Sequence, residues 1–345
     1  MDGADRLLAQ LGARLVEDGL PLKGGALTLA VPHPLIARRA WLWRAETGEV
    51  VEALDFALGG LAGGNPSGDA AVRWLAGIAA GTVQEDAVGR DRDRATLSWI
   101  GPRPFTMDEA EQLRQATRFA AAPIAALGAR ATLTAALEAY LGRRSAERVL
   151  AAPLRRGVGE TIDAALLYAD LRGFTALSES HPPPEVIAAL GAWFDRIAGA
   201  VHAFGGEVLK FIGDGVLAIF PVGGEAPRGA CEAALRAVSA ARAGMMRLDE
   251  ERQRQGRPAL PLGVALHLGE MLWGNIGAAN RLDFTAIGPA VNLVSRLQGL
   301  CRPLHNTVLV SGALAAEAKQ PLIPLGEHKL RGISSPCAVF TLPDD

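Results

Sequence analysis

The sequence predicts a helix-rich α/β protein with two domains. Its 345 residues are enough for two hydrophobic cores. Hydrophobic residues make up 49% of the chain, but aromatic residues only 5%, so alanine and glycine supply much of the apolar content. Short apolar runs typical of strands alternate with longer stretches of helical periodicity, which favours a mixed architecture.

The net charge and the cysteine content indicate which partners and which redox compartment to expect for the chain. The net charge of -2 gives no general attraction to nucleic acid or to anionic membranes. Three cysteines, Cys231, Cys301 and Cys337, lack metal-ligand spacing and predict free thiols in a reducing compartment. The first residues lack the basic and apolar regions of a signal peptide, and no apolar run approaches the roughly 20 residues that span a bilayer. We therefore expect a cytoplasmic protein without a membrane span or a nucleic-acid partner.

The first 128 residues predict a small α/β domain without a catalytic constellation. Helical periodicity is expected over 4–18 and from Thr106 to about 127, and strands over 26–31, 40–44 and 95–100. Loops are expected over 59–70 and 82–95. The strand, turn and long helix at the end of this region resemble the closing part of GAF-type sensory domains. That limited resemblance implies small-molecule sensing or dimerisation.

A helical connector is predicted over residues 130–150. Leu133, Leu137, Tyr140 and Leu141 are spaced to form an apolar stripe that suits a partner helix. In a two-domain chain, a signal would cross at this connector. A helix that simply packs on its own domain would show the same pattern.

The stretch from Gly205 to Phe220 predicts a β-hairpin. Two apolar runs, 208–212 and 216–220, flank a Gly-Asp-Gly turn with Asp214 at its tip. Turn chemistry alone explains an aspartate at this place, because tight hairpin turns favour Asp-Gly. Further chemistry for Asp214 therefore depends on partners elsewhere in the chain.

Two other places carry residues of chemical interest. Asp170 ends an apolar strand and is followed by a glycine-containing turn into a helix, a geometry that suits metal-bound polyphosphate. Asn292 and Arg296 are four residues apart on a predicted helix, so both project from one face. They could hold a sugar oxygen and a phosphate oxygen. In isolation, a cap is the usual explanation of an aspartate such as Asp170, and an incidental surface pair is the favoured explanation of Asn292 and Arg296.

These pieces occur in the order found in class III nucleotidyl cyclase catalytic domains, which residues 163–342 resemble. The resemblance rests on Tyr168–Thr175, Lys210–Asp214, Gly274–Gly277 and the run from Asp283 to Arg296. It implies an α/β (α+β) fold of the ferredoxin-like, palm type, with a central antiparallel sheet and flanking helices. The expected organisation is an N-terminal domain over 1–128, a linker over 129–160 and a catalytic domain over 161–345.

The resemblance also implies a role for each matching residue. Asp170 and Asp214 match the aspartates that hold two Mg²⁺ or Mn²⁺ ions. Asn292 matches the asparagine that orients the ribose, and Arg296 matches the arginine that stabilises the transition state. The positions that match substrate-binding residues around the phosphates are Gly173, Phe174, Thr175 and Arg331.

Base preference depends on Lys210 and Thr285. Lys210 matches the lysine with which adenylyl cyclases read the purine edge, where guanylyl cyclases usually carry an acid. Thr285 stands where the class IIIb subgroup typically has threonine, and its hydroxyl can accept from the adenine amino group. The pair favours ATP as substrate. Because some class IIIb enzymes respond to bicarbonate, bicarbonate is one candidate regulator.

The resemblance further implies a homodimer with shared active sites. In this fold the metal aspartates come from one domain and the base- and ribose-binding residues from the other, and this chain holds both sets. We therefore expect an adenylate cyclase that is regulated by its N-terminal domain. The alternatives are a cyclase for GTP or a pyrimidine nucleotide, and a nucleotide-binding regulatory module without turnover.

Overall fold

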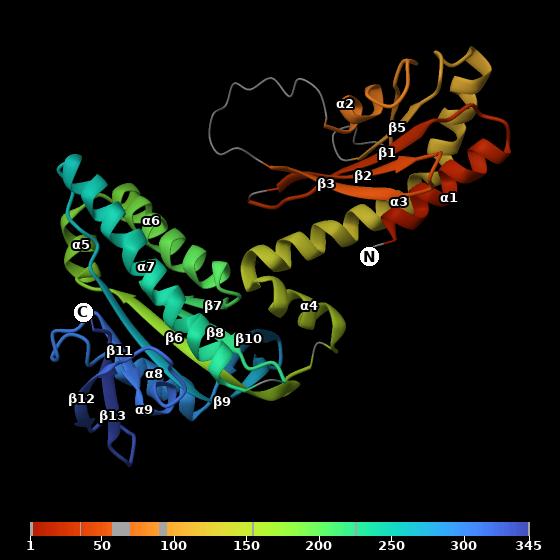
Figure 1. Cartoon of the computed structure of the whole chain (residues 1–345). Coiled ribbons are helices and arrows are strands. Elements are labelled where there is room, and N and C mark those ends of the chain that lie inside the picture. The colour runs from red at the N-terminus through yellow and green to blue at the C-terminus, as the bar shows by residue number, and fades with distance from the viewer. Residues whose placement is uncertain are drawn as a thin grey trace. The chain divides into compact units, whose positions relative to one another are not determined.

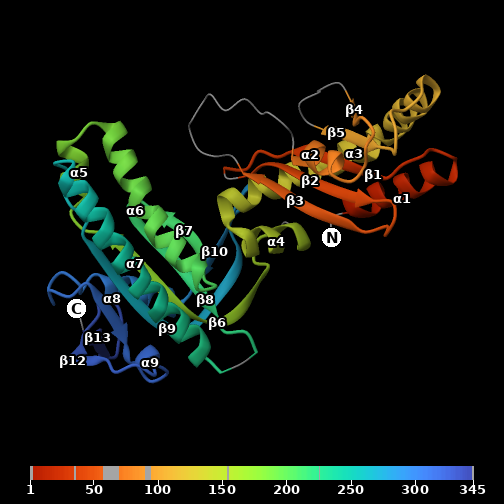
Figure 2. The same cartoon turned by 45° about the horizontal axis from the view of Figure 1, so that its top comes forward.

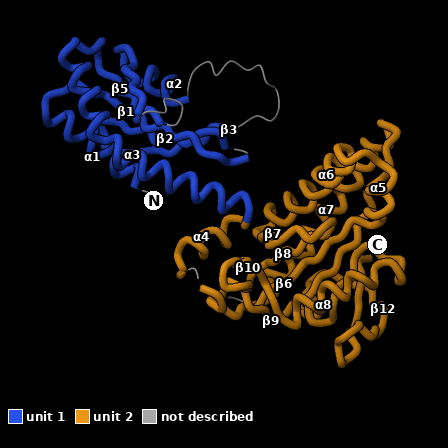
Figure 3. The backbone as a smooth tube through the Cα atoms, turned by 180° about the vertical axis from the view of Figure 1, so that it is seen from behind, with its two compact units in different colours: residues 1–140 blue, residues 141–345 orange. Residues whose placement is uncertain are grey.

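The chain folds into two compact units, residues 1–140 and 141–345 (Figure 3). The computed structural model describes residues 3–34, 36–56, 70–89, 95–153, 155–224 and 226–343. The loop expected over 59–70 lies outside these residues, except for Ala70, which begins a helix. Each unit is a mixture of sheet and helices, as the sequence predicts.

Unit 1 is built on a five-stranded antiparallel sheet (Figure 1). The strand order is β3-β2-β1-β5-β4, and every neighbouring pair is antiparallel. The elements are α1 (Ala4–Glu17), β1 (Gly24–Ala30), β2 (Ile36–Arg44), β3 (Val50–Phe56), α2 (Ala70–Ala76), β4 (Gln84–Ala87), β5 (Ala95–Ile100) and α3 (Met107–Leu141).

The two faces of this sheet are covered by different helices. Alternation along β1 directs Leu27 into a core shared with α1 and α3, while Ala26 joins a smaller core shared with α2. On the larger side, the Trp43 and Trp99 rings meet edge to face with centroids 6.3 Å apart. The helices therefore sandwich the sheet.

One prediction for this unit was wrong in part. The loop expected over 82–95 contains β4, which pairs with β5 along the edge of the sheet, and residues 90–94 lie outside the described residues. The connector over 130–150 is helical as predicted, but it is divided, because α3 runs without interruption to Leu141 and a second helix, α4 (Arg143–Ala151), follows Gly142. Gly142 has a φ of 82°, which favours glycine and ends the helix. On the connector stripe, Leu133 and Tyr140 are 52% and 89% exposed.

Unit 2 is built on a long mixed sheet (Figure 2). Its order is β12-β13-β11-β9-β6-β8-β7, with β10 paired to β9. The centre, β9-β6-β8-β7, is antiparallel as predicted, whereas β11 runs parallel to β9. The elements are α4, β6 (Gly159–Leu171), α5 (Phe174–Ser180), α6 (Pro183–Ala203), β7 (Glu207–Ile212), β8 (Gly215–Pro221), α7 (Arg228–Arg254), β9 (Leu262–Ala278), β10 (Arg281–Ile287), α8 (Pro289–Gln298), β11 (Val308–Ser311), α9 (Gly312–Ala315), β12 (Ile323–His328) and β13 (Cys337–Thr341).

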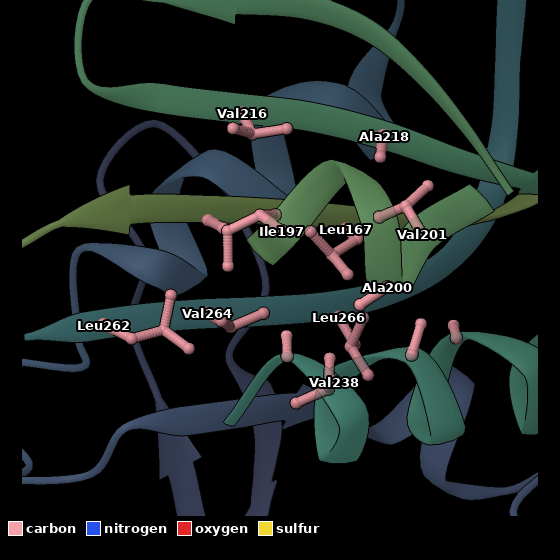
Figure 4. Close-up of a cluster of buried hydrophobic side chains, with 14 of the residues drawn as sticks. Leu167, Ile197, Ala200, Val201, Val216, Ala218, Val238, Leu262, Val264 and Leu266 are labelled. Atoms are coloured by element: carbon pink, nitrogen blue, oxygen red, sulfur yellow. The ribbon is translucent and has the colours of Figure 1, made fainter. Parts of the chain in front are cut away.

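Helices cover both faces of the central strands. Helices α6 and α7 lie side by side over one face, where Ile197 and Val238 pack against Leu167 and Leu266 of the strands (Figure 4). On the other face, α8 packs against the alternate residues of β6, including Leu166. The site-bearing strands are thus held from both sides.

Strand β9 is longer than the sequence predicts. The sequence favours a strand over 262–268 and a glycine-containing loop over 269–280, but β9 continues to Ala278 and pairs with β10 through a short turn. The glycines that suggested a loop have a packing role. A Cβ on Gly274 would lie 2.3 Å from the Cα of Gly159 on the neighbouring strand, so only glycine fits this close approach.

Helix α4 is tied to three strands of unit 2. The buried Glu207 carboxylate at the start of β7 accepts hydrogen bonds from the Ser145 amide (2.9 Å) and hydroxyl (2.7 Å). One turn later, Arg148 pairs with Glu160 at 2.5 Å and lies 4.3 Å over the Trp273 ring. These contacts connect α4 to β7, β6 and β9.

Two helices are long and apolar enough to cross a membrane by length and composition, α3 and α6. The expectation that no such run exists was therefore wrong on this criterion. Both helices contribute to a core, α6 through Trp193 and Ile197 and α3 through Leu113 and Ile124. Two such helices are weak evidence for a membrane span, because core helices of globular domains have the same character.

Candidate active site

The predicted hairpin places Asp214 at one edge of the unit 2 sheet. Ile212 of β7 pairs with Gly215 of β8, so the loop between the strands contains only Gly213 and Asp214. Gly213 has a φ of 62°, which a two-residue hairpin loop requires at its first position. The Asp214 carbonyl accepts from the Leu171 amide at 3.3 Å, which ties the loop to the end of β6.

Asp170 and Asp214 meet at this edge. Asp170 lies opposite Gly215 in the β6–β8 register, and its carboxyl group is hydrogen-bonded to that of Asp214. Burial, the negative charge of Asp214 and the hydrogen bond between the two carboxyl groups together raise the pKa of Asp170 to about 6. Two carboxyl groups that repel in this way form a site that favours a cation.

Two polar side chains that sequence reasoning missed hold Asp170 in place. Gln298, the last residue of α8, donates a hydrogen bond to its carboxylate, and the Arg172 guanidinium lies close enough for its charge to lower the pKa. Both pass over Gly263 of β9, where a Cβ would lie 2.9 Å from Arg172 Nε and 3.0 Å from Gln298 Nε2. Arg172 also donates to the Asn306 carbonyl. No short motif marks this arrangement, because its parts come from distant segments.

The aspartate pair fits the metal ions that the sequence implies. The described part of the chain contains no group of three or more histidine, cysteine, aspartate or glutamate residues that could hold a metal alone. Mg²⁺ does not need such a group, because it is commonly held by one or two carboxylates together with water and substrate phosphates. The oxygen donors of Asp170 and Asp214 match that preference.

The residues predicted to read the base lie on β7 and β10, which are not paired in the sheet but meet through their side chains. The Lys210 ammonium forms an ion pair with Asp283 of β10, and both side chains are about half exposed. Thr285 is two residues farther along β10, on the same side of the strand, and is 9% exposed. The structure thus brings Lys210 and the Thr285 segment together. Asp283 was not predicted as a site residue, although its period-two spacing from Thr285 is visible in the sequence.

Asn292 and Arg296 project from the exposed side of α8. Their neighbours Ala290, Val294 and Leu297 are buried in the core, while Asn292 and Arg296 themselves are exposed. Gln298 is two residues beyond Arg296, about 200° around the helix, so it projects to nearly the opposite side.

This geometry separates two sets of predicted site residues, the aspartate pair and the Asn292–Arg296 pair. Because Gln298 reaches Asp170, the aspartate pair lies on the opposite side of α8 from Arg296. In the described part of the chain, the charged groups acting on Asp170 are Asp214 and Arg172, and Arg296 is not among them. One chain therefore does not bring the two sets together.

The remaining predicted residues lie at the start of α5 and in one loop. Gly173, with a φ of 77°, immediately precedes α5, shortly after the aspartate-bearing strand. Phe174 packs partly against the core, and Thr175 is exposed. Arg331 is exposed in the connection between β12 and β13. The first three are next to Asp170 in the chain, whereas the link between Arg331 and the site remains a prediction.

Comparison with known proteins gives a consistent result. The family described as adenylate and guanylate cyclase catalytic domain matches residues 159–332. Adenylate cyclase 1 of Rhizobium meliloti is 32% identical over 180 residues, covering 52% of this chain and 27% of that protein. The adenylate cyclase of Anabaena cylindrica is 29% identical over 169 residues, covering 48% of this chain and 32% of that protein. The chain thus spans about a third of the length of these curated relatives.

Solved structures support the same assignment. The crystal structure of the adenylyl cyclase CyaB from P. aeruginosa superposes with a TM-score of 0.50 at 26% identity, covering 55% of this chain and 97% of that chain. A bacterial light-regulated adenylyl cyclase gives a TM-score of 0.55 over 76% of this chain and 86% of that chain, and at 21% identity it supports the fold alone. The chain belongs to the family of adenylate and guanylate cyclase catalytic domains, the class III nucleotidyl cyclases.

Proposed function

We propose that this chain is an adenylate cyclase, which converts ATP to 3′,5′-cyclic AMP and pyrophosphate. The observation that carries the proposal is the meeting of Asp170 and Asp214 at the end of the central strands. This carboxylate pair is what a reaction on a nucleoside triphosphate needs, because the substrate arrives with its phosphates bound to divalent cations.

Each predicted site residue has its own role in the proposed reaction. Asp170 and Asp214 would hold two Mg²⁺ or Mn²⁺ ions, which neutralise triphosphate charge and make the ribose 3′-hydroxyl more acidic. Asn292 positions the ribose so that this hydroxyl faces the α-phosphate. Arg296 stabilises negative charge that develops on the phosphoryl oxygens. The segment from Gly173 to Thr175 and the more distant Arg331 bind the phosphates.

Base selection is assigned to Lys210 and Thr285. Lys210 donates to a purine ring nitrogen, while the Thr285 hydroxyl accepts from the adenine amino group. Two relatives described as adenylate cyclases support ATP over GTP or a pyrimidine nucleotide. A competition assay with the four nucleoside triphosphates tests this preference, and a preferred base other than adenine would refute it.

We infer that the active enzyme is a homodimer with shared sites. The placement of Arg296 and Asp170 on opposite sides of α8 supports this, since a complete site then needs Asn292 and Arg296 from a second chain. A head-to-tail pair would form two equivalent sites.

The N-terminal region is proposed as the regulatory part of a cytoplasmic enzyme. In this proposal, residues 1–128 form the sensory domain, 129–160 the linker and 161–345 the catalytic domain. Its ligand is a small molecule, with bicarbonate as one candidate. Comparing the cyclase rate of the full chain with that of residues 155–345 tests regulation, and equal rates would argue against it.

The central experiment incubates purified full chain with ATP and either Mg²⁺ or Mn²⁺ and separates the nucleotides chromatographically. We expect cyclic AMP and pyrophosphate in equal amounts, and far less of both from the Asp170→Asn variant. ATP binding without turnover under both metals would instead favour a regulatory module that binds nucleotide.

A further inference from the structure

Unit 1 contains a cavity of about 800 Å³ between strand β4 and helix α3. Glu85 and Asp86 line it from the strand, and Arg114, Thr117 and Arg118 line it from the helix. Small-molecule sites commonly have volumes of roughly 300–1,000 Å³. The cavity belongs to the unit without a predicted catalytic constellation, so its polar lining needs another explanation.

Asp86 gives the cavity an unsatisfied acceptor. Its register partner is Leu97, which packs with α3, so the Asp86 side chain projects towards the helix. Oδ1 accepts from Gln84 at 3.2 Å, whereas Oδ2 is buried without a hydrogen-bond partner in the described part of the chain. Burial raises the pKa of Asp86, against the opposing effects of the Gln84 bond and the Arg114 charge. A ligand with an N–H donor would satisfy Oδ2.

The helix wall supplies the opposite charge. Arg114, Thr117, Arg118 and Ala121 recur at helical spacing, so they share one face of α3. Glu111 binds Arg114 at 2.8 Å but approaches Arg118 only to 4.0 Å, which is longer than a hydrogen bond. The Arg118 side chain is 75% exposed and can therefore turn its guanidinium to an acid group.

We propose that this cavity binds a small zwitterion of the free α-amino acid class, with its ammonium group on Asp86 and its carboxylate on Arg118. A simple anion would be repelled by Asp86, and a simple cation by the arginines. A zwitterion satisfies both walls at once. The proposal concerns unit 1 alone and is tested without nucleotide, so it stands or falls separately from the cyclase activity.

The first test measures binding to the full chain. Each of the common free L-amino acids is screened by thermal shift, and those that raise the melting temperature are titrated by calorimetry. For an amino acid that binds, the N-acetyl derivative lacks the ammonium group and the amide derivative lacks the carboxylate. We expect each blocked form to bind at least about tenfold more weakly, because each loses a charge-assisted hydrogen bond. The proposal is overturned if no amino acid binds or if a blocked form binds equally well.

The second test uses variants of the two walls. Asp86→Asn and Arg118→Gln should each weaken binding by about tenfold. Arg14→Gln is the matched control, because Arg14 is an exposed arginine of α1 that does not line the cavity. Its affinity should remain that of the unchanged protein. Arg118 is exposed enough that its replacement should not affect folding, so the test remains decisive if Asp86→Asn unfolds. Unchanged affinity in Arg118→Gln refutes the proposal.

Discussion

The two halves of the candidate active site differ in how far one chain assembles them. The metal half is already formed, since Asp170 and Asp214 are in contact and Gln298 and Arg172 act on Asp170. In the recognition half, Asn292 and Arg296 are exposed, and Lys210 forms an ion pair with Asp283. This half has donors ready for a substrate but lacks the carboxylates that would hold the metal ions.

If the site is shared between two chains, as proposed, the difference indicates which of its parts need early organisation. Two carboxylates in contact repel each other, so they need a rigid sheet edge and polar partners before any cation arrives. A guanidinium and an amide on a helix surface need no such support, because water satisfies them until substrate binds. Variants of each half test this division.

Replacing one of the two aspartates should prevent the pair from holding its metal ions. We expect Asp170→Asn to lower kcat by on the order of 10³-fold, because the amide keeps the shape but loses the charge that holds a cation. Asp163→Asn is the matched control, since Asp163 is exposed on the same strand. Steady-state cyclase assays compare the two. A loss of less than tenfold in Asp170→Asn would mean that the metal half lies elsewhere.

Mixing two inactive variants tests whether the halves come from different chains. Asp170→Asn spoils the metal half and Arg296→Ala the recognition half, so each variant alone should be nearly inactive. Random exchange makes half of the dimers mixed, each with one intact site, and should restore roughly a quarter of the unaltered rate. The measurement is cyclase activity after co-refolding or co-expression. Absence of any recovery, with mixed dimers confirmed by pull-down, would contradict shared sites.

Loss of the Gln298 hydrogen bond tests the internal support of the metal half. Gln298→Leu should weaken Mn²⁺ activation by roughly 10- to 100-fold, because partners behind a metal ligand commonly contribute that much. Removing this bond also raises the pKa of Asp170 further, since the bond favours the ionised form. The readout is the Mn²⁺ concentration for half-maximal activity. An unchanged value in a well-folded variant would show that Gln298 has no positioning role.

The smallest effect is expected in the recognition half. Asp283→Asn removes the ion-pair partner of Lys210 and should raise the KM for ATP about fivefold while changing kcat less, since the lysine is then less well oriented. Arg281→Gln on the same strand serves as the control. KM values for ATP and GTP provide the measurement. Equal KM values in Asp283→Asn and the unaltered chain would mean that Asp283 does not position Lys210.

Local patterns in the sequence predicted the parts of the site that are continuous in the chain. The hairpin around Asp214 was predicted by its apolar runs and glycines, and the Asn292–Arg296 face by their four-residue spacing. The strand before Asp170 was visible for the same reason. These features depend on local backbone chemistry, which a sequence displays directly.

Contacts between distant segments were not predicted. Gln298 and Arg172 meet over Gly263, and nothing local marks that meeting. The second half of β9 was missed because its glycines indicate a loop, whereas their reason is the close approach of a neighbouring strand. The short edge strand β4 was missed because a four-residue polar segment forms a strand only through its pairing with β5.

The long pairing of β6 with β9 has a consequence for synthesis of the protein. Asp170 lies on β6, and its neighbouring strand β9 begins only at Leu262. Gln298, which donates to Asp170, is synthesised later still. A nascent chain released up to the end of α7 has the aspartate pair in sequence but no β9 to fix the sheet edge. Pairing β6 with β9 closes a long segment of chain, and the conformational entropy lost in closing it slows folding. We therefore expect the metal half to form only after most of unit 2 has left the ribosome, which pulse proteolysis of stalled chains can measure.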